Sequence, residues 1–385
     1  MPRYNKKQKD RSAQRRQDPD YKPPIISVKN ENVHHFYPTT PIGWQQRFLH
    51  SHREKRHIRQ LVEEMAENPP VIHKLPETGT VLIHNPHRQD GLPLYWGIRL
   101  DKTTVGPAER SKIYQAFVEM ENPDNHVTWE VEKERKEAEL KAENDQGMSP
   151  RDRWLRAKLR RLLHLMCWDR RGNGPRVSAS TCQKHKNPVI LEKAQKSVLN
   201  FLGTVDAVLS GRPRRQFQKY DPEAAKTTAA VTSEKLYELY EFNEQWAAEA
   251  EARTGGTPLR GGLMGTTMAV GRGSSPGLHL DRRDFNSHSY SLVFCVSEGP
   301  EGWDKEGECT GDLEVPQLGC RVPIRPGQVF LFLSAVLAHR SVDDMDLETR
   351  YRRVFVTLFS DQELGEAVEG EWVDGVRPAP PVYPK

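Results

Sequence analysis

The chain has 385 residues, which is enough for a full enzyme core and allows one to three domains. It is hydrophilic, with 29% charged residues and a mean hydropathy of −0.76, and no apolar run approaches the roughly 20 residues that span a bilayer. The polar, basic start lacks the apolar core of a secretion signal. Five scattered cysteines argue against a disulfide framework and favour the cytosol or nucleus.

Positive charge is concentrated at the start of the chain. Residues 1–60 hold 14 Lys and Arg against 5 Asp and Glu, whereas the remainder holds 43 against 48. A basic arm on a mildly acidic body suggests a polyanionic partner such as nucleic acid, although a solvated tail without a partner fits equally well. Because aliphatic residues are almost absent before residue 30, we predict a disordered arm over residues 1–40. Basic pairs such as Lys6-Lys7 permit nuclear import, so we expect a nuclear or otherwise a cytoplasmic protein.

Residues 41–255 are expected to form a helix-rich part. Cap residues followed by proline, at Ser149-Pro150 and Asn187-Pro188, predict two helix starts. The first helix should carry an apolar stripe that extends to Leu162 and Met166, and the second should end at Gly211. The other expected elements are a helix over about 43–66, strands at 80–84 and 95–100, a charged helix over 126–145, a loop over 212–231 and a helix over 233–253.

Residues 256–385 have a different character, because short β-branched and aromatic runs alternate with glycine and proline. This pattern indicates an antiparallel sandwich or barrel packed against the preceding helices, and an α+β protein overall. The expected strands are 266–270, 290–296, 320–324, 328–333 and 353–359.

The sequence His279-Leu280-Asp281 is the sharpest chemical feature. On an extended segment, residues i and i+2 project to the same face, so one imidazole and one carboxylate can grip a metal from one side. A distant histidine, His339, would complete a facial triad with three open coordination positions. Taken alone, a histidine such as His279 is more often an ordinary loop histidine, and a carboxylate such as Asp281 is more often an ordinary turn carboxylate.

The order of the later motifs makes the metal interpretation stronger. A glycine-bounded segment (311–319), a Pro-Gly turn at Gly327 and a β run precede His339, and an arginine cluster at 350–353 precedes the last hydrophobic strand. Over roughly residues 260–362 this set resembles the double-stranded β-helix (jelly roll) of the 2-oxoglutarate oxygenases. The resemblance implies Fe(II), the cosubstrate 2-oxoglutarate and O2. A metal-binding cupin is the alternative reading of the same architecture.

In that family an arginine binds the distal carboxylate of 2-oxoglutarate, because a guanidinium fork matches a carboxylate. Arg350 has the family's common spacing after His339, and Arg352 stays open as well. We prefer Arg353, which begins the strand and shares its face with Thr357, a small polar residue of the kind common there in the demethylase branches. Arg272 is a further candidate to help hold the cosubstrate.

The segment 275–286 resembles the TET/JBP branch of nucleic-acid base oxygenases, in which the target base is flipped out of the duplex. The resemblance implies that Asp284 contacts the flipped base, although a loop carboxylate paired with a neighbouring arginine is an equal alternative. The other base-contact candidates are Asn286 and Asp361, the latter standing where the family often has histidine. Candidate DNA-backbone contacts are Arg282, Arg283, Arg214 and Arg215.

We therefore expect a dioxygenase that oxidises methyl groups of 5-methylcytosine or 6-methyladenine in double-stranded DNA. A prolyl-hydroxylase-like protein or small-molecule hydroxylase is the first alternative, which the 311–319 segment also resembles. A non-catalytic DNA-binding module is the second.

Overall fold

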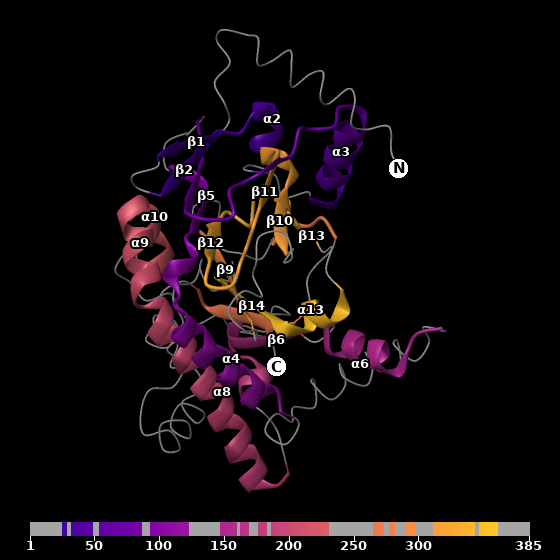
Figure 1. Ribbon diagram of the computed structural model, residues 1–385, viewed down its shortest axis with the longest axis vertical. Coiled ribbons are helices and arrows are strands. Elements are labelled where there is room, and N and C mark those ends of the chain that lie inside the picture. Colours follow the sequence, from indigo (N-terminus) through magenta and orange to yellow (C-terminus); the bar gives the residue numbers. More distant parts are fainter. Residues whose placement is uncertain are drawn as a thin grey trace, which may run out of the picture.

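The computed structural model describes residues 25–28, 32–48, 54–86, 93–122, 147–159, 162–168, 176–182, 186–230, 265–272, 277–281, 289–297, 311–342 and 346–360. Over these ranges the chain forms helices and two mixed β-sheets, which is an α+β architecture (Figure 1). None of the helices in these ranges is both long enough and apolar enough to span a bilayer.

The larger sheet has ten strands among the described residues and combines both halves of the chain. Only β2 and β4 pair in parallel, and every other neighbouring pair is antiparallel. In spatial order the strands are β1 (Ile25–Val28), β2 (Val33–Phe36), β4 (Thr80–His84), β5 (Tyr95–Leu100), β12 (Val329–Phe332), β9 (Ser291–Ser297), β14 (Arg353–Phe359), β8 (Thr267–Gly271), β6 (Leu162–Trp168) and β7 (Arg176–Val177).

The smaller sheet consists, in spatial order, of β13 (Arg340–Val342), β10 (Asp312–Val315), β11 (Cys320–Val322) and β3 (His73–Lys74). Its β3–β11 pair is parallel, and its other pairs are antiparallel. An isolated bridge joins His279 to His339, the residue directly before β13. The segment that carries His279 therefore lies beside the β13 edge of this sheet.

Several helices pack beside the larger sheet, on the side away from the smaller one, whereas α2 contacts the turn between β10 and β11. In Figure 1, α8, α9 and α10 lie along one side of the molecule, while β10 and β13 lie beyond β12 and β9 on the other. Helix α4 contacts both β9 and α8. The helices are α2 (Ile42–Gln45), α3 (Glu54–Glu67), α4 (Pro107–Glu121), α6 (Pro150–Leu159), α7 (Ala179–Cys182), α8 (Pro188–Leu209), α9 (Arg212–Tyr220), α10 (Pro222–Ala230) and α13 (Leu347–Arg352), with 3-10 turns η2 (Lys102–Thr104) and η3 (Pro316–Leu318).

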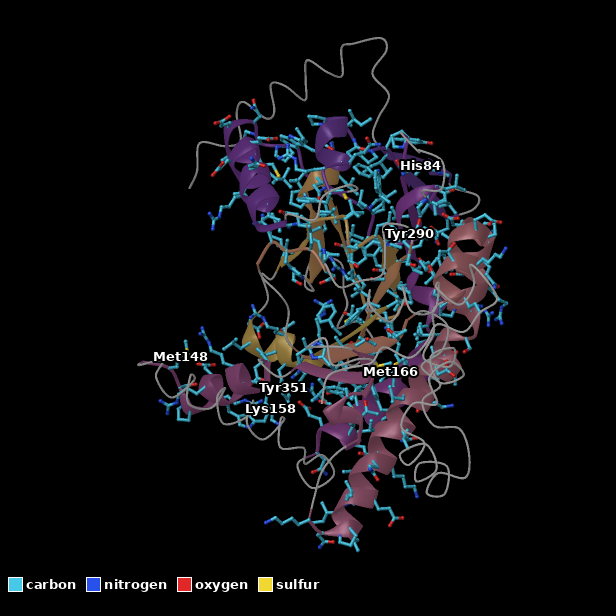
Figure 2. The ribbon with its side chains drawn as sticks, turned by 180° about the vertical axis from the view of Figure 1, so that it is seen from behind. His84, Met148, Lys158, Met166, Tyr290 and Tyr351 are labelled. Atoms are coloured by element: carbon cyan, nitrogen blue, oxygen red, sulfur yellow. The ribbon has the colours of Figure 1, made fainter. Side chains whose placement is uncertain are left out.

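The burial pattern of β14 separates the two faces of the larger sheet. Val354, Val356 and Leu358 are at most 2% exposed, whereas the alternate residues Phe355 and Thr357 are only partly buried. Alternate side chains of a strand project to opposite faces, so the partly exposed set shares its face with Arg353. Figure 2 shows side chains filling the layers and labels Tyr290, whose hydroxyl donates to the carbonyl oxygen of Tyr95 at 2.6 Å.

The expected extension of the helix after Pro150 to Leu162 and Met166 is wrong. Helix α6 ends at Leu159, and residues 162–168 form β6, which pairs with β8 from Leu162↔Gly271 to Met166↔Thr267. A short apolar run is compatible with either structure, and here a strand about 100 residues further along the chain decides it.

Three other expectations also change. The helix over 43–66 is two helices, α2 and α3, and the loop over 212–231 contains α9 and α10. Pro213 and Pro222 stand at the starts of these last two helices, and the Asp221 carboxylate accepts a hydrogen bond from the Ala224 N–H. Strands β1 and β2 lie inside the arm predicted over 1–40. The helices expected over 126–145 and 233–253 lie outside the described residues.

Candidate metal centre

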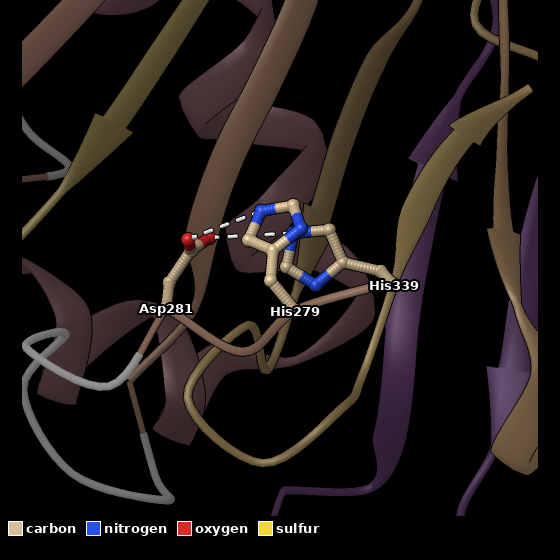
Figure 3. A group of neighbouring side chains, drawn as sticks. All are labelled: His279, Asp281 and His339. Carbon is tan, nitrogen blue, oxygen red and sulfur yellow. Dashed lines mark ion pairs between the residues drawn. The ribbon is translucent and has the colours of Figure 1, made fainter. Parts of the chain in front are cut away.

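Two histidines face each other across the isolated bridge. His279 N–H donates to the His339 carbonyl at 3.0 Å, and His339 N–H donates to the His279 carbonyl at 2.9 Å. Their rings lie on the same side, with centroids 4.4 Å apart. Asp281 follows two residues after His279, and its N–H donates to the carbonyl of Ser334 at 3.2 Å. The extended backbone therefore turns all three side chains toward one point, as Figure 3 shows.

Second hydrogen bonds orient both imidazoles. Nδ1 of His279 lies 2.8 Å from the Gly277 carbonyl, and Nδ1 of His339 lies 2.8 Å from the Leu337 carbonyl. A carbonyl can only accept, so each Nδ1 carries a proton, and Nε2 is the nitrogen that can bind a metal once it has lost its own proton. Both Nε2 atoms face the Asp281 carboxylate, at 3.6 Å for His279 and 3.4 Å for His339.

This donor set fits a divalent transition metal. One potential ligand atom from each of the three residues lies within 4.8 Å of the others, and this is the one such group found in the described ranges. Adjacent ligands of an octahedral ion with bonds of about 2.1 Å are separated by about 3 Å, so a small inward adjustment closes the site. Two imidazoles and one carboxylate on one side form a facial triad.

The surroundings of the triad are unequal. His339 has a side chain only 6% exposed, while those of His279 and Asp281 are each 33% exposed. Phe332 packs edge-on against the His339 ring at 4.9 Å and stacks with Phe330. Burial raises the pKa of the Asp281 carboxyl, but the interactions with His339 and His279 outweigh burial and bring the pKa below its usual value. The carboxylate is thus ionised and suited to a cation.

Arg353, the preferred cosubstrate residue, begins β14 and is fully buried between the two sheets. Its Nη2 donates to the carbonyl of Ile324 at 2.8 Å, and its Nε donates to Sγ of Cys295 at 3.4 Å. The ring of Phe355 lies 4.4 Å from the guanidinium carbon. A guanidinium held in this way, on the strand face turned toward the smaller sheet, is suited to an anionic ligand.

Of the other cosubstrate candidates, only Thr357 lies on the same strand face as Arg353. Arg350 is on helix α13, not on the strand, and is partly buried. Thr357 shares the face of Arg353 four residues further along β14. Arg272 is buried and pairs with Glu121 at 2.9 Å, and its contacts to the Tyr351 carbonyl and ring hold it in a structural network.

Arg214 and Arg215, expected at the DNA backbone, are exposed on helix α9. The remaining predicted contacts lie outside the described residues: Arg282, Arg283, Asp284, Asn286 and Asp361. Their roles stay predictions.

The sequence reasoning missed the residues that surround Arg353, namely Gly311, Cys295 and Ile324. For Gly311 the signal was available, because a glycine next to a β segment can mark a close approach by another group. For Cys295 and Ile324 no local signal exists, since both meet Arg353 only through the pairing of distant strands.

Comparisons with known proteins give little. No protein-family model matches the chain, and no curated protein matches it. One solved structure that matches is NgTET1 in complex with 5mC DNA, with 12% sequence identity, a TM-score of 0.34, and coverage of 80% of this chain and 91% of that one. A structural likeness this distant defines neither the fold nor the function of the chain.

Proposed function

We propose that the chain is an Fe(II)- and 2-oxoglutarate-dependent dioxygenase that oxidises methyl groups on DNA bases. The observation that carries this proposal is the group formed by His279, Asp281 and His339, with both Nδ1 atoms bonded to backbone carbonyls and both Nε2 atoms facing the carboxylate. Few structural roles require two oriented imidazoles and an ionised carboxylate at one point.

The strand order supports a double-stranded β-helix as the fold of residues 265–360. Four strands adjoin in the larger sheet as β12-β9-β14-β8, and the smaller sheet continues from β11 through β10 and β13 to the bridge at His279. Along the chain these segments pass repeatedly from one sheet to the other, as the strands of a jelly roll do. The triad then lies at one edge of the smaller sheet.

Each residue has a definite task in this proposal. The triad would hold iron on one side and leave three positions for cosubstrate and oxygen. Iron held there would supply the activation of O2. Arg353 would bind the distal carboxylate of 2-oxoglutarate, with Thr357 beside it on the strand and Arg350 as the alternative. One oxygen atom of O2 would enter succinate as the cosubstrate loses CO2, and the other would enter the methyl group as hydroxyl.

A DNA substrate is the finer part of the proposal. It is supported by the excess of positive charge in residues 1–60 and by the exposed arginines of α9. A base inside a duplex must be flipped out to reach the metal, and phosphate contacts would offset the few kcal/mol lost in unstacking. Asp284, Asn286 and Asp361 stay the candidates for contacting 5-methylcytosine or 6-methyladenine, and a nuclear location would follow from such a substrate.

The test is an anaerobic reconstitution with Fe(II) and 2-oxoglutarate, followed by air and duplexes that carry either methylated base. Bound iron, succinate and oxidised bases are measured by mass spectrometry and metal analysis. His339→Ala should abolish stoichiometric iron binding and succinate formation. His73→Ala is the matched control, because His73 lies on β3, at the opposite edge of the smaller sheet. This variant should bind iron as the unmodified chain does.

The outcomes separate the alternatives. Succinate together with oxidised base supports the full proposal and identifies the base. Succinate without base oxidation keeps the oxygenase and directs the search to protein or small-molecule hydroxylation. Tight duplex binding without iron uptake, or iron uptake that is unaffected by His339→Ala, rejects the dioxygenase in favour of a binding module.

A further inference from the structure

The guanidinium of Arg353 lies where the side chain of residue 311 would be. Gly311 has φ +134°, and a Cβ atom added to it would overlap Nη1, Cζ and Nη2 of Arg353. The conformation itself is one that residues with side chains rarely adopt. Glycine is therefore needed here for two reasons, of which the close approach of Arg353 is the stronger.

Two hydrogen bonds and one ring fix the direction of the same guanidinium. Nε donates to Sγ of Cys295 at 3.4 Å, Nη2 donates to the Ile324 carbonyl at 2.8 Å, and the Phe355 ring lies at 4.4 Å. Cys295 and Phe355 are directly paired across β9 and β14. The acceptors come from β9 and from the turn after β11, so the orientation of Arg353 depends on both sheets.

The backbone around Arg353 is held firmly in place. Asp312, next to Gly311, accepts a hydrogen bond from Nη1 of Arg325, next to Ile324, at 2.8 Å, and both side chains are at most 4% exposed. Nη2 of Arg325 also reaches Glu77 at 2.9 Å. This buried ion pair links the two backbone segments that border the guanidinium, so a new side chain at residue 311 must move Arg353 and not the backbone.

We propose that Gly311 and Cys295 are positioning residues that set the orientation of Arg353 and thereby the affinity for the dicarboxylate cosubstrate; this inference rests on the proposed function. With alanine at residue 311, the guanidinium has to retreat by roughly 2 Å to reach ordinary van der Waals contact. A two-pronged bond between guanidinium and carboxylate depends on geometry and is lost at such a displacement. Cys295 controls the same bond through Nε, with a smaller effect.

The first measurement is calorimetric titration of 2-oxoglutarate into the full chain loaded with Mn(II) under nitrogen, after Mn(II) binding has been measured separately. Gly311→Ala should weaken the binding of 2-oxoglutarate at least tenfold and change the affinity for Mn(II) by less than twofold. Cys295→Ala should weaken the binding of 2-oxoglutarate by a few-fold. Cys295→Ser, which keeps a hydrogen-bond acceptor, should recover most of the lost affinity. Gly203→Ala is the matched control, because Gly203 is exposed on α8 with no atom near its added Cβ.

The second measurement is a double-mutant cycle in thermal stability without ligands. Gly311→Ala should lower Tm in the presence of Arg353, and this loss should shrink by more than half in an Arg353→Ala background, where the overlapping side chain is absent. If Gly311→Ala alone does not fold, the double variant should recover folding, and the Cys295→Ala and Cys295→Ser pair still provides the binding comparison.

Unchanged 2-oxoglutarate affinity in Gly311→Ala overturns the inference, as does an equal loss of Tm in both backgrounds. A chain that binds Mn(II) but no 2-oxoglutarate overturns the proposed function instead. In that case the cycle still decides whether Gly311 positions Arg353. The two failures are therefore distinguishable.

Discussion

Replacing Arg325 with methionine tests how the two sheets are joined around Arg353. Arg325 pairs with Asp312 at 2.8 Å and with Glu77 at 2.9 Å. The side chains of Arg325 and Asp312 are 4% and 2% exposed, and that of Glu77 is 14% exposed. Methionine keeps much of the length of arginine and removes its charge and its donors. The substitution therefore removes the hydrogen-bonded cation of the buried Asp312 carboxylate and leaves it only the charge of the buried Arg99, which also acts on it.

The magnitude follows from this burial. Breaking a buried ion pair by removing one partner costs about 3–5 kcal/mol, chiefly because an uncompensated charge stays in the interior. Glu77 adds little to the loss, since it keeps Lys74 at 2.6 Å. Replacing both partners, as in Arg325→Met with Asp312→Leu, removes the stranded charge, so most of the lost stability should return.

Urea denaturation followed by tryptophan fluorescence measures these differences in the free energy of unfolding. The matched control is Arg340→Met, which breaks a pair with Glu314 whose arginine is 49% exposed. Glu314 retains Arg321 at 3.7 Å, so we expect a loss of less than about 1 kcal/mol. Equal losses for Arg325→Met and Arg340→Met would refute the reasoning. A double variant as unstable as Arg325→Met would refute it as well.

Two further predictions concern pH and DNA. Burial, together with the charge of His35, lowers the pKa of His84 from 6.5 to about 4, so the unfolded chain binds a proton more readily than the folded one between these values. The free energy of unfolding should fall as pH drops from about 6.5 to about 4, by roughly 1–2 kcal/mol after allowance for the partial exposure of His84. Urea denaturation at a series of pH values measures this dependence, and His84→Phe should make it weaker over the same pH range. An unchanged dependence on pH would contradict the assignment to His84. Arg214→Ala and Arg215→Ala should each reduce the slope of log K for duplex DNA against log salt concentration by about 1, without changing stability. The control is Lys196→Ala, an exposed residue on α8, and fluorescence anisotropy measures the binding. The same slope for all three variants would remove α9 from the DNA interface.

Local patterns were enough for several elements. Proline after a cap residue marks the start of α8, where the Asn187 side chain accepts a hydrogen bond from the Val189 N–H at 3.0 Å. The β-branched and aromatic runs mark β4, β5, β9, β12 and β14 close to their observed bounds. Such signals come from neighbouring residues, whose periodicity reflects the geometry of a helix or a strand.

Local patterns failed where a partner far along the chain decides the structure. The run at Leu162 forms a strand because β8 is available to pair with it. Strand β2 is ordered although it lies in a polar, basic region, because it adds to β4 in parallel register. In both cases the hydrogen bonds go to residues more than 40 positions away, which no local window contains.

The sequence by itself determined which side chains can bind a metal, since His279 and Asp281 share a face on any extended segment and His339 is the one histidine that follows them beyond the intervening strands. Only the tertiary structure decided that they meet, through the reciprocal backbone bonds between His279 and His339. It also decided that Arg353 lies between the sheets while Arg350 lies on a helix. The physical reason is that spacing along a chain sets the direction of a side chain, whereas its neighbours are set by the pairing and packing of distant strands.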